Sequence, residues 1–209
     1  RALSTDQVSK LTTTQIVGLS TAQVAALSTG QVASLTSVQI NAMASDDLKA
    51  LTTAQVRALT SDQLSKLSSD QVALMATDDI AAISTAQISH LSTAAIAALT
   101  TAQAKALTTA SINALTSAQV AAIETADLAV LSTAQLNKLG TAQLAQLTSV
   151  QVTALTSAQL KSLSSDQVAA LTSAQLNALT SAQLPSLSSA QVRALSTDQV
   201  SKLTTTQIV

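Results

Sequence analysis

The chain lacks several residue types on which most globular domains rely. Its 209 residues include no cysteine, phenylalanine, tyrosine or tryptophan, one histidine and one proline. The absence of cysteine excludes disulfides, thiolate metal sites and cysteine nucleophiles. Because aromatic side chains normally fill the wider spaces of a core, their absence predicts a thin core of leucine, valine, isoleucine and alanine.

Charged side chains are also scarce. They make up 10% of the chain, and the formal net charge is −1. No basic patch is present, which argues against a nucleic-acid partner and against attachment to an anionic membrane surface. No apolar run approaches the ~20 residues that a membrane span requires. We therefore expect neither nucleic-acid binding nor membrane insertion.

The chain consists of one eight-residue unit repeated throughout. Residues 51–58 (LTTAQVRA) recur with changes as residues 59–66 (LTSDQLSK), and such octads follow one another without a gap from residue 3 to residue 209. We number the columns of the octad one to eight, with Leu51 in column one. Columns one and six are apolar, column three is always Ser or Thr, and columns two and five are mostly Ser/Thr and Gln. Self-similarity at a fixed period indicates a solenoid or an array.

Each octad carries the signals that start a helix. Ser or Thr in column two with Gln three residues later is a capping box, and the apolar columns one and six form a hydrophobic staple around it. Where column two is Ala44, Ala76 or Glu124, column five becomes Asp. In those octads we expect the cap to move to the column-three hydroxyl of Ser45, Thr77 or Thr125.

The charges indicate the same helix polarity. All acidic residues lie in columns two to five and all basic residues in columns seven or eight, as the helix dipole favours. We therefore predict one short helix per octad, from about column two to column eight. In one continuous helix, column one would drift by ~80° per octad. In a strand, columns one and six would face opposite sides, which disfavours the alternative of a β-solenoid.

The variation in column six indicates how many helices form one coil. In every third octad this column contains Ile or Leu and never Val, as at Ile16, Ile40, Leu64, Ile88, Ile112, Leu136, Leu160 and Leu184. We therefore predict an all-α solenoid with three helices in each 24-residue coil. A weaker difference between odd and even octads keeps two helices per coil as the alternative. We expect alanines of columns four and eight to pack between coils, and column-three hydroxyls to bond carbonyls of a neighbouring helix or coil.

A longer repeat contains the octads. Residues 1–17 are identical to residues 193–209, an offset of 192 residues or 24 octads. No Pro/Gly cluster or change of composition marks a boundary between domains. We predict one continuous solenoid over residues 1–209, which contains one super-repeat and an overlap. Because neither end shows a polar capping unit, we expect the segment to belong to a longer chain or a polymer.

Few side chains are candidates for chemistry. His90 lies in column eight, where a surface position near a helix C-terminus explains it. A calcium site at adjacent carboxylates is the other candidate, but helix-start charge accounts for them and no calcium-loop spacing is present; these residues are Asp46, Asp47, Asp78 and Asp79, with Asp62 and Asp70 between them. Pro185 is expected to cause local fraying. We predict no catalytic, cofactor-binding or metal site, and no enzyme activity.

Two resemblances bear on function. The phrase Leu-Thr-x-x-Gln-Val/Ile, as at residues 51–56, resembles helix starts in the repeats of TAL effectors, but the base-reading loop and the basic surface are absent. The whole array resembles the low-complexity repeat regions of giant bacterial cell-surface or secreted, adhesin-like proteins. That resemblance implies an extracellular or cell-surface stalk, fibre or sheath.

From these features we expect a structural protein that forms a stiff rod, filament or sheath. Its partners are expected to be other copies, along or between rods, and other extracellular components. The stalk of a giant adhesin is one alternative. A binding module for ice or calcium, using the regular Ser/Thr or Asp rows, is another.

Overall fold

The computed structural model describes residues 3–208, and every regular element within them is a short helix. Each α-helix starts at column three of an octad and ends within columns six to eight, whereas the 3₁₀ helix of residues 184–186 starts at column six. The prediction of one short helix per octad is therefore confirmed. The chain divides into two units, residues 1–107 and 108–209.

Thirteen helices lie in the described part of the first unit. They are α1 (Thr5–Ser9), α2 (Thr13–Val17), α3 (Thr21–Ala25), α4 (Thr29–Ser34), α5 (Ser37–Ala42), α6 (Ser45–Lys49), α7 (Thr53–Ala58), α8 (Ser61–Ser65), α9 (Ser69–Leu74), α10 (Thr77–Ala82), α11 (Thr85–Ile88), α12 (Thr93–Ala97) and α13 (Thr101–Ala106).

The helices of the second unit continue the same pattern. They are α14 (Thr109–Ala114), α15 (Ser117–Ala121), α16 (Thr125–Val130), α17 (Thr133–Leu136), α18 (Thr141–Leu144), α19 (Ser149–Ala154), α20 (Ser157–Ser162), α21 (Ser165–Ala169), α22 (Ser173–Ala178), the 3₁₀ helix η1 (Leu184–Ser186), α23 (Ser189–Arg193), α24 (Thr197–Ser201) and α25 (Thr205–Ile208).

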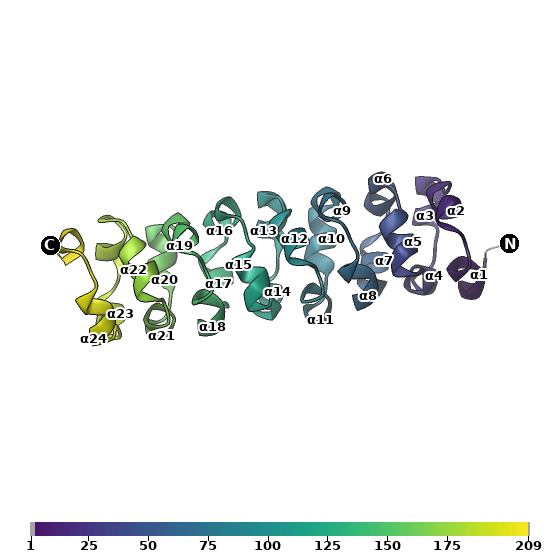
Figure 1. The fold of residues 1–209 in the computed structure, drawn as a ribbon. Coiled ribbons are helices and arrows are strands. Elements are labelled where there is room, and N and C mark those ends of the chain that lie inside the picture. Colours follow the sequence, from purple (N-terminus) through teal and green to yellow (C-terminus); the bar gives the residue numbers. More distant parts are fainter. Residues whose placement is uncertain (1–2, 209) are drawn as a thin grey trace. The chain divides into compact units, whose positions relative to one another are not determined.

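Within each unit, helices three octads apart stack on one another (Figure 1). In the first unit, one row runs α1–α4–α7–α10–α13, a second α2–α5–α8–α11 and a third α3–α6–α9–α12. In the second unit the rows are α14–α17–α20–η1, α15–α18–α21–α23 and α16–α19–α22–α24. Three helices therefore make one coil, as column six predicts, and the two-helix alternative is wrong.

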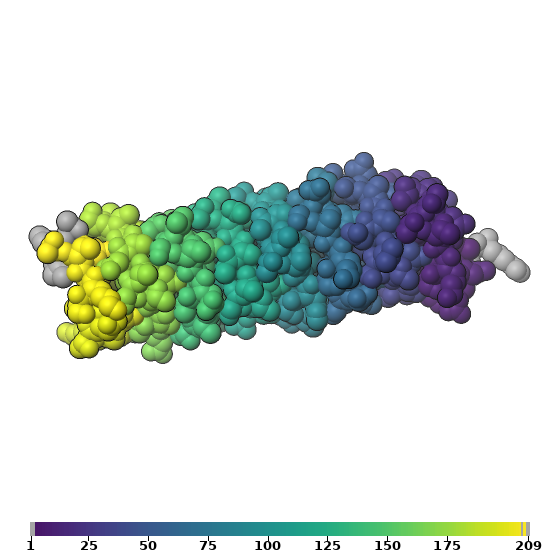
Figure 2. Space-filling model, viewed as in Figure 1, coloured from purple at the N-terminus to yellow at the C-terminus, as the bar shows by residue number. Residues whose placement is uncertain are grey.

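Successive coils follow the order of the sequence. In the space-filling view of each unit, the colours form consecutive bands, from purple to blue in the first unit and from teal to yellow in the second (Figure 2). Each coil therefore packs mainly against the coils before and after it, as in other solenoids. The continuity of the solenoid from one unit to the next stays a prediction.

The core is a narrow apolar column, as the missing aromatic residues predict. Column-six side chains such as Val56 and Leu64 are fully buried, and column-one side chains such as Leu59 lie beside them. Column eight is half-buried at Ala50 and Ala58, but column four is exposed, for example at Ala54. The expectation that column four packs between coils is therefore wrong. Each residue turns a helix by ~100°. When columns five and six face the core, column four is therefore turned toward solvent.

Capping boxes start most of the helices. In α8, the Gln63 N–H donates to Thr60 Oγ1 at 3.3 Å, while Gln63 Oε1 accepts from the Thr60 N–H at 2.7 Å. Substituting Ala for such a cap costs about 0.5–2 kcal/mol. The boxes therefore fix where each short helix begins.

The predicted shift of the cap to column three is wrong. Ala44, Ala76 and Glu124 remain the N-cap residues of α6, α10 and α16, and none of them makes a side-chain cap bond. Moving a helix start by one residue would rotate its apolar face by ~100°, and burial of columns one and six prevents that rotation.

Pro185 changes the helix type of its octad. η1 replaces the α-helix found in the other octads of its row, because proline has no N–H for the α-helical bond. Thr180 and Gln183 still form both bonds of the capping box, at 3.0 and 3.2 Å. Leu184 also remains buried, so the octad keeps its place in the stack.

No helix in the described part of the chain is both long and apolar enough to cross a membrane.

Candidate functional site: the glutamine ladder

The buried column-five glutamines form the most regular polar feature of the structure. We call them the glutamine ladder, and their side-chain bonds to the preceding coil are resolved within each unit. The members are Gln31, Gln39, Gln55, Gln63, Gln71, Gln87 and Gln103 in the first unit, and Gln143, Gln151, Gln159, Gln167, Gln175, Gln183, Gln191, Gln199 and Gln207 in the second.

Each ladder amide connects its own helix start to the coil before it. Gln63 Oε1 accepts from the Thr60 N–H, while Gln63 Nε2 donates to the carbonyls of Val32 at 2.8 Å and Leu35 at 2.6 Å. These carbonyls lie 31 and 28 residues earlier. Val32 lies in the last turn of α4, and Leu35 is the column-one residue that caps the end of that helix. One amide side chain therefore bonds the backbone at the start of its own helix and the backbone of the preceding coil.

The same geometry recurs along both units. Gln103 Nε2 donates to the Val72 and Met75 carbonyls, both at 2.8 Å. In the second unit, Gln159 Nε2 donates to the Leu128 and Leu131 carbonyls at 2.9 and 2.8 Å. A helix leaves its last four carbonyls without intrahelical partners. The ladder supplies donors to the column-one carbonyls, and it adds a second donor to column-six carbonyls such as that of Val72, which also accepts from the Met75 N–H at 3.2 Å.

The first coil shows what burial of the ladder requires. Gln7, Gln15 and Gln23 make their capping boxes but are exposed, because no described coil precedes them. From Gln31 to Gln103, the column-five glutamines of the first unit are buried and bond the coil before them. The capping box is therefore a property of one octad, whereas the ladder bond is a property of two stacked coils.

The ladder also corrects the expectation for column three. A column-three hydroxyl does reach a neighbouring carbonyl at Ser149, which donates to Ala174 at 3.4 Å. Thr53 and Ser173 instead contact the carboxylates of Asp79 and Asp198. As a general rule the expectation is wrong, because the regular bond between coils comes from column five.

The sequence did contain a signal for this role. A capping box accepts Glu as well as Gln, and a negative charge near a helix N-terminus is favourable. Glu nevertheless never occurs in column five. The use of Gln and never Glu in column five indicates that the side chain needs an amide donor as well as the acceptor of the capping box.

Buried aspartates interrupt the ladder. Asp47, Asp79 and Asp127 occupy column five and are almost fully buried. Burial raises the pKa of each carboxyl. Asp79 accepts a bond from Thr53 Oγ1 at 3.3 Å, which partly offsets the rise in its pKa. Oδ2 of Asp127 is buried with no hydrogen-bond partner.

The other sequence candidates do not converge on a site. Asp46 and Asp78 are exposed while Asp47 and Asp79 point into the coil, so adjacent carboxylates do not share one surface. His90 is exposed. Among the described residues, no group of three or more His, Cys, Asp or Glu side chains is placed to hold a metal ion.

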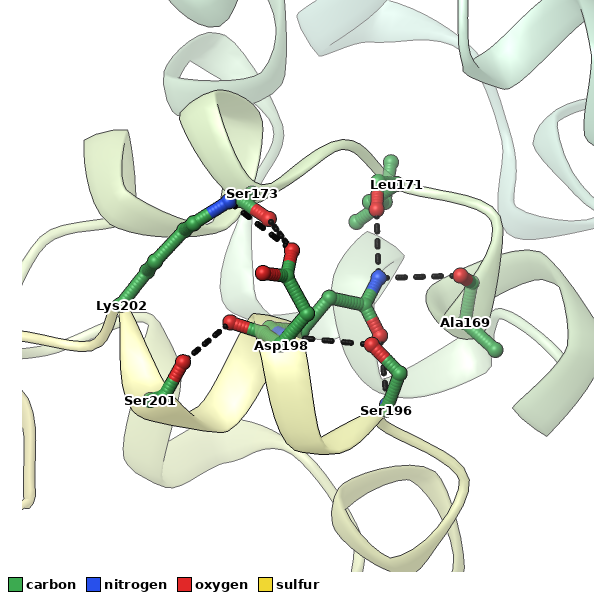
Figure 3. A network of polar contacts seen from close by, with 8 residues as sticks. Ala169, Leu171, Ser173, Ser196, Asp198, Ser201 and Lys202 are labelled. Carbon is green, nitrogen blue, oxygen red and sulfur yellow. Dashed lines mark hydrogen bonds and ion pairs between the residues drawn. The ribbon is translucent and has the colours of Figure 1, made fainter.

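A surface network accompanies the ladder near the end of the second unit (Figure 3). Asp198 accepts from Lys202 Nζ at 2.9 Å and from the Ser173 hydroxyl at 3.2 Å, so it links α24 to α22. The bond from Lys202, followed by that from Ser173, lowers the pKa of Asp198. Beside it, Gln199 donates to the carbonyls of Ala169 at 3.0 Å and Leu171 at 2.6 Å. The exposed network adds a second contact to the same pair of coils.

The stacked octads and their ladder define an α-solenoid repeat protein. A family model described as the ALTTAQ repeat matches residues 16–45, 40–77, 72–109, 120–157, 153–181 and 178–209. These matches cover most of the chain, which belongs to this repeat family. A comparison with curated proteins found no match.

Proposed function

We propose that the chain is a structural protein that builds an extracellular or cell-surface filament, rod or sheath from stacked coils. The observation that supports this proposal most is the recurrence of one interface every 24 residues within each unit. A repeat that contacts only its neighbours can be lengthened without new kinds of contact.

The ladder and the apolar columns make two stacked coils costly to separate. Separating two coils exposes column-one and column-six side chains, each worth ~1.5–3 kcal/mol when fully buried. It also leaves buried carbonyls without their amide donors, at ~1–3 kcal/mol each. Because both costs arise at one interface, we propose a mechanical role rather than a catalytic one.

Immunogold electron microscopy of intact native cells tests this role. Antibodies raised against the 209-residue chain should label continuous filaments or a coat outside the cells. Label confined to the cell interior would overturn the proposal. Label along the shafts of separate fibres that end in globular heads would assign the chain to the stalk of an adhesin instead.

A further inference from the structure

The glutamine ladder is complete at one contact between coils in the interior of the first unit. We call the contact between two stacked coils a joint. The coil α7–α8–α9 stacks on the coil α4–α5–α6, and its three column-five residues are all glutamines (Figure 1). Each donates to a column-one carbonyl of the coil before it: Gln55 to Leu27 at 2.7 Å, Gln63 to Leu35 at 2.6 Å and Gln71 to Met43 at 3.1 Å. Ladder bonds therefore cross this joint on all three rows of helices.

The next joint of the same unit keeps one of the three glutamines. The coil α10–α11–α12 stacks on α7–α8–α9, and its column-five residues are Asp79, Gln87 and Ala95. Gln87 donates to the Leu59 carbonyl at 2.7 Å. Asp79 has no amide, and its carboxylate accepts from the Thr53 hydroxyl at 3.3 Å. Ala95 has no polar side-chain group, although it is completely buried.

The two missing amides leave buried backbone oxygens without a ladder donor. A ladder amide reaches the column-one carbonyl 28 residues earlier, which is that of Leu51 for Asp79 and that of Leu67 for Ala95. Leu51 and Leu67 are both buried. A buried acceptor that loses its donor weakens the closed state by about tenfold in its equilibrium constant. When the joint opens, water can bond these carbonyls, so opening is easier here than at a complete joint.

A second interaction is missing from the same coil. The N-cap residue of α10, Ala76, makes no side-chain cap bond, whereas α7, α8 and α9 all start with capping boxes. The apolar column is intact, since Ile80, Ile88 and Ile96 are fully buried. The coil α10–α11–α12 therefore keeps its apolar contacts and lacks several of the polar bonds that hold the coil before it.

We propose that the coil α10–α11–α12 is a yielding segment, which detaches from α7–α8–α9 before coils with complete joints open. Its helices contain four to six residues, and helices of this length do not persist alone. Detachment therefore unwinds them and releases extended chain. In a mechanical protein, this release relieves a load at a defined place. That use rests on the proposed structural function, whereas the order of opening does not.

Hydrogen exchange of the whole 209-residue chain, followed by mass spectrometry, tests the order of opening. The reference is the coil α19–α20–α21 of the second unit, in which Gln151, Gln159 and Gln167 all donate to the coil before them. Each peptide is normalised to its own exchange in the unfolded chain. Amides of residues 77–98 should then exchange at least about tenfold faster than those of residues 149–170. Equal exchange of the two segments would overturn the proposal.

Two double variants test whether the ladder is the cause. Asp79→Gln with Ala95→Gln supplies both missing amides, and Ser92 already provides the cap hydroxyl for position 95. This variant should slow exchange of residues 77–98 about tenfold and leave residues 149–170 unchanged. Gln151→Ala with Gln167→Ala removes the first and third amides of the reference coil, and it should speed exchange of residues 149–170 about tenfold. Circular dichroism establishes that both variants remain helical.

Exchange of residues 77–98 that does not respond to the added amides would overturn the proposal. Unchanged exchange of residues 149–170 after removal of two amides would also overturn it, because the ladder would then not hold a joint closed. The immunogold result is separate. Fast exchange of residues 77–98 together with label confined to the cell interior would reject the structural function and leave the yielding segment standing.

Discussion

At the scale of single residues, the amide of each column-five glutamine of the ladder has two roles. Its oxygen and its nitrogen make different bonds. In Gln63, the oxygen completes a capping box and the nitrogen bonds two carbonyls of the preceding coil. A carboxylate of the same shape can perform only the first task. This difference allows the two tasks to be separated by mutation.

We expect Gln63→Glu to lower the free energy of unfolding by ~2–4 kcal/mol, because it buries a carboxylate against two carbonyls. The Leu35 carbonyl loses its amide donor, and the Val32 carbonyl keeps only the bond from the Leu35 N–H. Gln15→Glu is the matched control, since Gln15 lies in the same row of helices but is exposed. There the change should stay within about ±0.5 kcal/mol. Urea unfolding followed by circular dichroism measures both, and equal effects at the two positions would contradict the ladder.

The buried aspartates predict an unusual dependence of stability on pH. Burial, followed by the charge of Asp46, raises the pKa of Asp47 above its ordinary value of 3.8, although a backbone bond from Ala44 opposes the rise. An acid whose pKa is higher in the folded state binds protons more tightly there. Its ionisation therefore disfavours folding above the raised pKa, and this penalty disappears as the pH falls toward 3.8.

Asp47→Asn should therefore raise the stability at neutral pH and reduce the gain in stability that acidification gives. Asp62→Asn, at an exposed column-four position, should leave the pH profile of the parent chain in place. Thermal unfolding at a series of pH values provides the measurement. A variant at position 47 that is less stable than the parent at neutral pH would show that the ionised carboxylate stabilises the coil.

At the scale of helices, a capping box and an apolar pair are enough to predict each element from its octad. Residues 59–66 contain Thr60, Gln63 and the apolar Leu59 and Leu64, and α8 begins where they indicate. Octads without a hydroxyl in column two were predicted less well. At Ala44 the cap has no side-chain bond, yet α6 keeps its register because Leu48 must remain in the core.

Pro185 provides a test of how much one intrahelical hydrogen bond contributes to the stability of the chain. At the equivalent position of the same row, the Asn137 N–H donates to the Thr133 carbonyl at 2.9 Å. Pro185→Ala should restore this bond in its own octad, convert η1 to an α-helix and stabilise the chain by about 1 kcal/mol. Helical circular dichroism and urea unfolding would report the change.

The reciprocal change is the control for Pro185. Asn137→Pro should cost ~3 kcal/mol or more, because proline removes the N–H and clashes with the preceding turn. If both changes left stability unaltered, the α-helical bond at column seven would have no part in holding the octads.

At the scale of the whole molecule, the arrangement into coils could be predicted because the rows differ in composition. Column six of one row never contains Val, and the structure places those octads in the rows α2–α5–α8–α11 and α14–α17–α20–η1. The ladder was not predicted, since the capping box gives a complete local explanation of the same glutamines. A bond to a carbonyl 28 residues away becomes visible only when the coil length is known.

The distance between labelled sites in neighbouring octads tests the 24-residue coil most directly. The natural chain contains no cysteine, so paired cysteines can carry spin labels without background. Ala54 and Asp78 lie 24 residues apart on the stacked helices α7 and α10. Ala54 and Asp70 lie 16 residues apart, on α7 and α9, which belong to different rows. All three positions are exposed.

Stacked helices lie ~8–10 Å apart, so the pair at positions 54 and 78 should show strong dipolar broadening in continuous-wave electron paramagnetic resonance spectra. The pair at positions 54 and 70 should show clearly weaker broadening, and singly labelled chains provide the reference for both. Stronger broadening at 54 and 70 than at 54 and 78 would indicate two helices per coil and contradict the account.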